Sequence, residues 1–169
     1  SLITELKQRH YQKALVVTDK ALIEAGVSKK VMQLLDENAF PYDIYDDIKP
    51  NPNVLNVNEG LETLRNSKAD VLIAVGGGSV IDTAKCMSII MTNPEFSDVI
   101  SLDGTAATKN KGMPLIALPT TAGTAAEVTI NYVITDDERK KKMVCVDPHD
   151  IPEIAIIDPE LMEAMPKSL

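Results

Sequence analysis

The chain has 169 residues, a length that suits one domain with a substantial core. Its 25 acidic side chains outnumber the 17 lysines and arginines, and the formal charge of −8 argues against nucleic acid or an anionic membrane as a partner. No stretch approaches the roughly 20 apolar residues of a membrane span, and no secretion signal is recognised. Cys86 and Cys145 lack the spacing of metal ligands, so we expect free, buried thiols in a cytoplasmic protein.

Helices and short apolar strands alternate along the chain. In the first half, the pattern predicts a helix over 2–12, a strand over 14–18, helix over 20–38 with a break at Gly26 and a new cap at Ser28, a strand over 42–45 and a helix over 54–66. In the second half, it predicts a strand over 71–75, a helix over 80–91, a strand over 115–118, a β-hairpin of 130–135 and 142–146, and a strand over 154–157. The alternation predicts an α/β fold with a doubly wound, mostly parallel sheet of Rossmann-like topology, plus the hairpin.

Residues 71–85, VLIAVGGGSVIDTAK, form the most informative segment. A buried strand runs into Gly76, Gly77 and Gly78, and Ser79 is expected to cap the helix that follows. Glycines let the backbone approach phosphate oxygens, and the first amides of a helix attract negative charge. The segment therefore predicts a phosphate or pyrophosphate site. A plain tight turn is the alternative, because the spacing matches neither common phosphate-loop pattern.

Two further polar corners are expected beside these glycines, because the carboxyl ends of parallel strands share one edge, where ligands bind. Asp19 ends one strand, and the loop 119–124 (PTTAGT) follows another. Asp19 either accepts hydrogen bonds from the ribose of an adenine dinucleotide or caps the next helix. Thr120, Thr121 and Thr124 either bind a nucleotide or form an ordinary polar turn.

Four other residues are candidates with weaker patterns. Asp82 and Lys85 are three apart on a predicted helix, so they share a face, where they either pair with each other or leave Asp82 facing the ligand. Asn131 and Lys142 lie on the paired strands of the hairpin and either reach the ligand or point to solvent. Neither histidine has the spacing of a metal ligand. The residues alone indicate a nucleotide-binding domain with no visible reaction centre and no metal site.

The segments GGGSVIDTAK (76–85) and PTTAGTAAEVT (119–129) together resemble the iron-dependent (group III) alcohol dehydrogenases, a fold family that includes glycerol dehydrogenase and dehydroquinate synthase. The resemblance covers essentially the whole chain. It implies the NAD-binding N-terminal domain of that fold. For the full-length parent it implies Fe(II), or Zn, as the metal, a short-chain alcohol or diol and its aldehyde as substrates, and a homodimer.

The resemblance also implies which residues hold NAD. Asp19 matches the family acid at the adenosine ribose, residues 77–79 match the pyrophosphate loop, and Asn51 matches a motif near the adenine side. Asn131 and Lys142 match positions that flank the nicotinamide half. The complete set of cofactor candidates is Asp19, Asn51, Gly77, Gly78, Ser79, Asp82, Thr120, Thr121, Thr124, Asn131 and Lys142.

The family's metal ligands, an aspartate and three histidines, belong to a helical C-terminal domain beyond the point that matches Leu169. We therefore expect residues 1–169 to be one cofactor domain that is inactive by itself. A stand-alone, non-catalytic nucleotide-binding module is the alternative. A butanol, methanol, 1,3-propanediol or glycerol dehydrogenase is a second alternative, within the same family.

Overall fold

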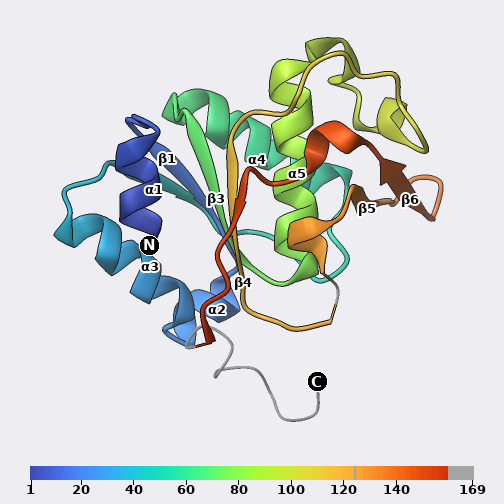
Figure 1. Cartoon of the computed structure of the whole chain (residues 1–169). Helices are drawn as coiled ribbons and strands as arrows, with labels where there is room; N and C mark the ends of the chain where they lie inside the picture. Colours follow the sequence, from blue (N-terminus) through green and yellow to red (C-terminus); the bar gives the residue numbers. More distant parts are fainter. Residues whose placement is uncertain (124, 160–169) are drawn as a thin grey trace.

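A parallel sheet of five strands forms the centre of the molecule in the computed structural model, which describes residues 1–123 and 125–159 (Figure 1). The strand order is β2-β1-β3-β4-β7, and every neighbouring pair is parallel. The strands are β1 (Ala14–Val17), β2 (Tyr42–Tyr45), β3 (Val71–Gly76), β4 (Leu115–Pro119) and β7 (Ile154–Ala155). The predicted α/β fold with a doubly wound sheet is confirmed.

Helices cover both faces of this sheet (Figure 1). They are α1 (Leu2–Gln8), α2 (Lys20–Glu24), α3 (Val27–Glu37), α4 (Val54–Ser67) and α5 (Gly78–Thr92). Alternate residues of the central strands feed two separate cores: Val16 and Ile73 pack with α1 and α3, whereas Leu15 and Leu72 pack with α4 and α5. Successive side chains of a strand point to opposite faces, so the near-continuous apolar runs of the sequence serve both cores.

The predicted hairpin is present as β5 (Asn131–Asp136) and β6 (Lys141–Val146), a separate antiparallel pair. It lies against α5, and Tyr132, Ile134 and Met143 join the core of that face of the sheet. The antiparallel register places Thr135 opposite Lys142. The hairpin therefore forms a second wall beside the carboxyl edge of the main sheet.

Two expected helix starts were wrong. Helix α5 begins at Gly78 with Gly77 as its N-cap residue, and no side chain caps it, so Ser79 lies inside the helix. Helix α3 begins after Gly26, which has φ of 83°, and Ser28 is buried with its hydroxyl 2.6 Å from that of Thr18. At Gly26 the positive φ favours glycine, which adopts it without a Cβ penalty. Gly77 has an extended backbone with φ of −87°, so its conformation does not itself require glycine.

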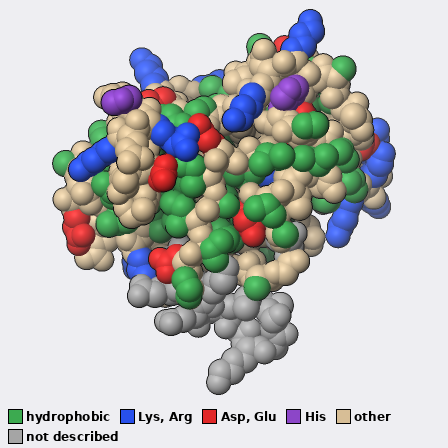
Figure 2. Space-filling view, in the orientation of Figure 1, with side chains coloured by type: hydrophobic (Ala, Val, Ile, Leu, Met, Phe, Trp, Pro, Cys, Tyr) green, Lys and Arg blue, Asp and Glu red, His purple; other side chains and the backbone are tan. Residues whose placement is uncertain are grey.

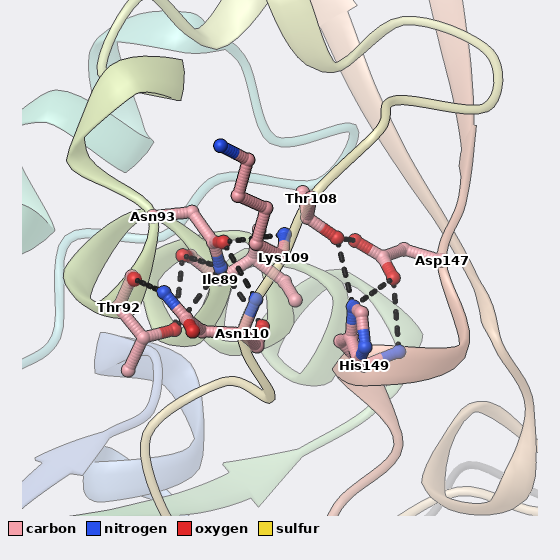
Figure 3. A network of polar contacts seen from close by, with 8 residues as sticks. All are labelled: Ile89, Thr92, Asn93, Thr108, Lys109, Asn110, Asp147 and His149. Carbon is pink, nitrogen blue, oxygen red and sulfur yellow. Dashed lines mark hydrogen bonds and ion pairs between the residues drawn. The ribbon is translucent and has the colours of Figure 1, made fainter.

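The connection from α5 to β4, residues 93–113, is held by side-chain hydrogen bonds (Figure 3). It contains the 3-10 helices η1 (Pro94–Phe96) and η2 (Val99–Leu102); two others, η3 (Ala126–Val128) and η4 (Pro148–Asp150), flank the hairpin. The amide oxygen of Asn93 accepts from the backbone N–H groups of Lys109 and Asn110, both at 3.0 Å. The connection is therefore an ordered part of the fold although it lacks long elements.

The face of the molecule seen in Figure 2 is mixed in character. On this face, acidic and basic side chains are interspersed, and hydrophobic side chains lie between them. Among the described residues, no helix has both the length and the apolar content needed to cross a membrane.

Candidate functional site

Two cavities open at the carboxyl edge of the sheet and share residues Gly78 and Ser79 at the start of α5. The first has a volume of about 570 Å³, and the second about 450 Å³. The polar and glycine residues around the first are Asp19, Lys20, Asp46, Asp47, Lys49, Gly77, Gly78, Ser79, Thr120 and Thr121. Around the second they are Asn51, Gly78, Ser79, Asp82, Thr135 and Lys142. Together the two cavities hold nine of the eleven predicted cofactor residues.

Residues 76–78, which we call the glycine corner, bring backbone without side chains to the place where the two cavities meet. Gly76 ends β3, and its carbonyl oxygen accepts from the backbone N–H of Thr120 at 3.0 Å, which joins the loop after β4 to this corner. A Cβ atom on Gly77 would lie 3.1 Å from Oγ1 of Thr121. The first residues of α5, Gly78 and Ser79, border both cavities, so the positive end of the helix dipole lies where the cavities meet, and no side chain caps it. This geometry suits a phosphate group.

Asp19 caps helix α2, which is one of the two roles that were open for it from the sequence. One of its carboxylate oxygens accepts from the N–H of Leu22 at 2.8 Å and so caps α2. The same residue lines the first cavity and forms a β-bridge with Asp47. The ammonium group of Lys20 lies 3.3 Å from a carboxylate oxygen of Asp47. Three carboxylates, of Asp19, Asp46 and Asp47, face two ammonium groups, of Lys20 and Lys49, so this end of the cavity has a net negative charge.

Asp82 and Lys85 each hydrogen-bond the hairpin. A carboxylate oxygen of Asp82 accepts from the backbone N–H of Val133 at 3.1 Å. The Lys85 ammonium donates to the carbonyl oxygens of Thr129 at 2.7 Å and Asn131 at 3.1 Å. Burial raises the pKa of Asp82 to about 6, since desolvation disfavours the carboxylate. The sequence predicted that Asp82 and Lys85 share a face of the helix, but it did not predict that this face packs against the hairpin.

The remaining candidates are placed as follows. Asn51, expected near the adenine side, lines the second cavity together with Lys142, and not the first cavity with Asp19. Asn131 has an exposed side chain and does not line either cavity. Thr124 lies outside the described residues.

Sequence reasoning missed the acidic pair Asp46 and Asp47 and the buried residue Asp150. Asp46 and Asp47 directly follow β2, so the strand-end argument that selected Asp19 could also have found them. Asp150 lies with its nearer carboxylate oxygen 4.0 Å from the Lys85 ammonium, and both side chains are fully buried. Asp150 and Lys85 are 65 positions apart in the sequence, so no local sequence pattern links them.

The described residues offer neither a metal centre nor a nucleophile–base arrangement. Among them, no group of three or more His, Cys, Asp and Glu side chains is placed to hold a metal ion. Thr108, His149 and Asp147 form a polar cluster in which the hydroxyl and the carboxylate both contact Nδ1 of the imidazole (Figure 3). A catalytic triad uses both ring nitrogens, so this cluster is structural and holds the connection 93–113 to η4.

A parallel sheet with a glycine corner and cavities at its carboxyl edge defines the class of α/β proteins that bind ligands at this edge. The family model described as "Iron-containing alcohol dehydrogenase" matches residues 1–159. The chain belongs to this family, which confirms the resemblance drawn from the two motifs. The buried thiols Cys86 and Cys145 are both free, as expected.

Relatives and solved structures agree with the family. The chain is 55% identical over all 169 residues to lactaldehyde reductase of Escherichia coli (strain K12), of which it covers 44%. It is 37% identical over 164 residues (97% of the chain, 42% of the relative) to alcohol dehydrogenase 4 of Saccharomyces cerevisiae (strain YJM789). The chain thus spans less than half the length of these relatives.

Among solved structures, a 1,3-propanediol oxidoreductase superposes with a TM-score of 0.91 at 37% identity, covering 98% of this chain and 43% of that one. Sulfoacetaldehyde reductase from Bifidobacterium kashiwanohense, solved in complex with NAD+, superposes with a TM-score of 0.85 at 32% identity, covering 96% of this chain and 43% of that one.

Proposed function

We propose that residues 1–169 are the NAD-binding domain of a metal-dependent oxidoreductase that interconverts short-chain alcohols or diols with their aldehydes. Lactaldehyde and 1,2-propanediol are the substrates we favour, because of the 55% identity to a lactaldehyde reductase. The observation that carries the proposal is the uncapped start of α5, where two cavities meet on glycine backbone. The relative solved with NAD+ has the same fold over 96% of this chain.

Each part of NAD has a suitable set of residues. The pyrophosphate would lie on residues 77–79, where a side chain at Gly77 would crowd Thr121 and where the helix dipole favours negative charge. The adenosine half would fill the first cavity, with its ribose hydroxyls at the Asp19 oxygen that is not the acceptor for Leu22. The nicotinamide half would fill the second cavity beside Lys142.

The chemistry divides between the cofactor and these residues. NAD, when bound, supplies the acceptor for the hydride. The residues of this domain would bind the cofactor, orient its nicotinamide and limit the access of water from the side of the hairpin. The described residues do not fit a metal centre, so we assign Fe(II), or Zn, to another part of the complete protein and derive no step through it.

The acidic end of the first cavity favours NAD over NADP. The 2′-phosphate of NADP would meet Asp19, with Asp46 and Asp47 nearby. Like charges repel, and Lys20, the basic residue closest to this position in sequence, is already paired with Asp47. We therefore assign the domain to NAD.

Two alternatives to this function remain from the sequence: a different substrate within the family, and a non-catalytic nucleotide-binding module. We favour an enzyme because the relatives named above are a reductase and a dehydrogenase. We further propose a cytoplasmic location, which suits two free thiols, and a homodimeric complete protein, which the family resemblance alone supports.

The test uses the complete protein that contains this chain. We expect oxidation of 1,2-propanediol with NAD in the presence of Fe(II), followed as NADH absorbance, and no turnover or stoichiometric metal in purified residues 1–169. Saturable NAD binding without turnover on any short alcohol would support the non-catalytic module. Stoichiometric iron in residues 1–169 would contradict our placement of the metal.

A further inference from the structure

Lys85 is a fully buried cation that makes its hydrogen bonds outside its own helix. Its ammonium group donates to the carbonyl oxygens of Thr129 and Asn131, at 2.7 and 3.1 Å, and lies 3.3 Å from the Thr129 hydroxyl. Its side chain has 0% exposure. These acceptors belong to the segment that leads from the loop after β4 into β5. Lys85 thus ties the beginning of the hairpin to α5.

Burying an ammonium group is unfavourable unless it is well paired, and here the pairing is incomplete. The nearer oxygen of Asp150 is 4.0 Å away, and neither oxygen of that carboxylate has a hydrogen-bond partner among the described residues. Burial lowers the pKa of Lys85 and raises that of Asp150 to about 8. An apolar side chain would pack a helix against a hairpin without this penalty. Lys85 therefore provides what apolar packing does not, namely directional hydrogen bonds from α5 to the hairpin.

The hairpin to which Lys85 is bonded forms one wall of the second cavity. Val133, Thr135 and Lys142 of the hairpin line that cavity, and Asp82, one turn before Lys85, holds the Val133 N–H. Lys85 itself does not line either cavity. The first cavity is built from the ends of β1 and β2, the glycine corner and the loop after β4, with no residue of the hairpin.

We propose that Lys85 is a positioning residue for the nicotinamide half of the cofactor: by fixing Thr129 and Asn131 on α5, it sets the hairpin so that Lys142 stands at the second cavity. This proposal rests on the proposed function. The motif GGGSVIDTAK then has two roles, with residues 77–79 serving the pyrophosphate and Asp82 and Lys85 serving the hairpin. A ligand confined to the first cavity is expected to be independent of Lys85.

The experiment compares NAD with ADP, which has the pyrophosphate and adenosine but no nicotinamide half. In the complete protein, Lys85→Met should weaken NAD binding about tenfold, as expected when a binding group is displaced by a fraction of an ångström, and change ADP binding by less than about twofold. Lys141→Met is the matched control. It removes an exposed ammonium from the same hairpin, where Lys141 pairs with Asp103 and lines neither cavity. It should leave both ligands unchanged.

A double-mutant cycle with Lys142 distinguishes positioning from general loosening. If Lys85 acts through Lys142, Lys85→Met should weaken NAD binding by less than about twofold when Lys142 is already Met. Amide hydrogen exchange should rise in β5 and β6 and stay unchanged in β1 and β3. If Lys85→Met does not fold, Lys85→Met/Asp150→Asn, which removes both buried charges, takes its place in every comparison.

Equal weakening of NAD and ADP would overturn the proposal, and so would a full tenfold effect of Lys85→Met in the Lys142→Met background. Unchanged NAD binding in folded Lys85→Met would overturn it as well. Absence of NAD and ADP binding in the wild-type protein has a different meaning, because it would refute the proposed function itself.

Discussion

A Cβ atom placed on Gly77 would lie 3.1 Å from the hydroxyl oxygen of Thr121, so the glycine corner and the loop after β4 approach each other closely at the candidate site. Both residues line the first cavity. A larger side chain at position 77 would therefore occupy space between the two loops, where we place the pyrophosphate.

We expect Gly77→Val to weaken NAD binding at least about tenfold, because its branched side chain blocks the approach of phosphate to the backbone. Gly78→Val should act in the same direction, since Gly78 borders both cavities. Calorimetric titration with NAD measures the effect, and circular dichroism checks the fold. Normal NAD binding by a folded Gly78→Val variant would mean that the glycines form only a turn.

Gly76, one residue earlier, should behave differently. Its Cβ would lie 2.5 Å from Cγ2 and 2.7 Å from Cβ of Val80, a branched residue with 1% exposure, so the neighbouring atoms would have to shift. We expect Gly76→Ala to destabilise the fold by about 1–3 kcal/mol through overpacking. Urea unfolding measures this change. A Gly76→Ala variant with wild-type stability would show that the turn relaxes around the added methyl group.

Asp19→Gly should reduce the preference for NAD over NADP. The substitution removes the carboxylate that would lie beside a 2′-phosphate, and glycine is itself an acceptable N-cap, so α2 should lose only a few tenths of a kcal/mol. We expect the ratio of the NAD and NADP affinities to fall by about tenfold. Asp43→Asn is the control, because it removes an exposed carboxylate of β2 that lies outside both cavities. An unchanged ratio in Asp19→Gly would reject the assignment of Asp19 to the ribose.

Asp82 should make stability depend on pH. Its pKa is about 6 in the folded protein and 3.8 as the ordinary value, so the charged carboxylate is disfavoured in the fold. The penalty is absent below pH 4, grows between pH 4 and 6 and is complete above pH 6. Asp82→Asn keeps an acceptor for the Val133 N–H and removes the charge.

The free energy of unfolding of Asp82→Asn, taken relative to that of the wild type, should therefore rise by about 2 kcal/mol from pH 4 to pH 7. Urea unfolding of both proteins at these two pH values measures the gain. A difference in free energy of unfolding that is the same at both pH values would show that Asp82 carries no such penalty.

The sequence predicted the strands better than the helix starts, for a physical reason. Runs such as 71–75 are apolar on both faces because the sheet is covered on both sides, so they stand out without any tertiary information. Ser79 and Ser28 have the right chemistry for N-caps, but the N-cap residues are Gly77 and Gly26, each two positions earlier. The path of the chain determines whether a helix begins at a serine hydroxyl or at a glycine turn.

The site was predictable where it depends on strand ends and not where it depends on docking. The strand-end rule selected Asp19, the glycines and Thr120 correctly as neighbours. The spacing of Asp82 and Lys85 predicted a shared helix face, but their partners lie 44 to 51 positions further along the chain. No local pattern reports which segment docks on a helix face.

The most direct test of the account is a titration of the 169-residue chain with NAD, followed through the backbone amide resonances of residues 77–79. We predict that these amides shift with NAD and with ADP alike, because both ligands place a pyrophosphate at the start of α5. We also predict that residues lining the second cavity, such as Val133 and Thr135, shift only with NAD. Saturable NAD binding that leaves the amides of residues 77–79 unshifted would contradict the central claim.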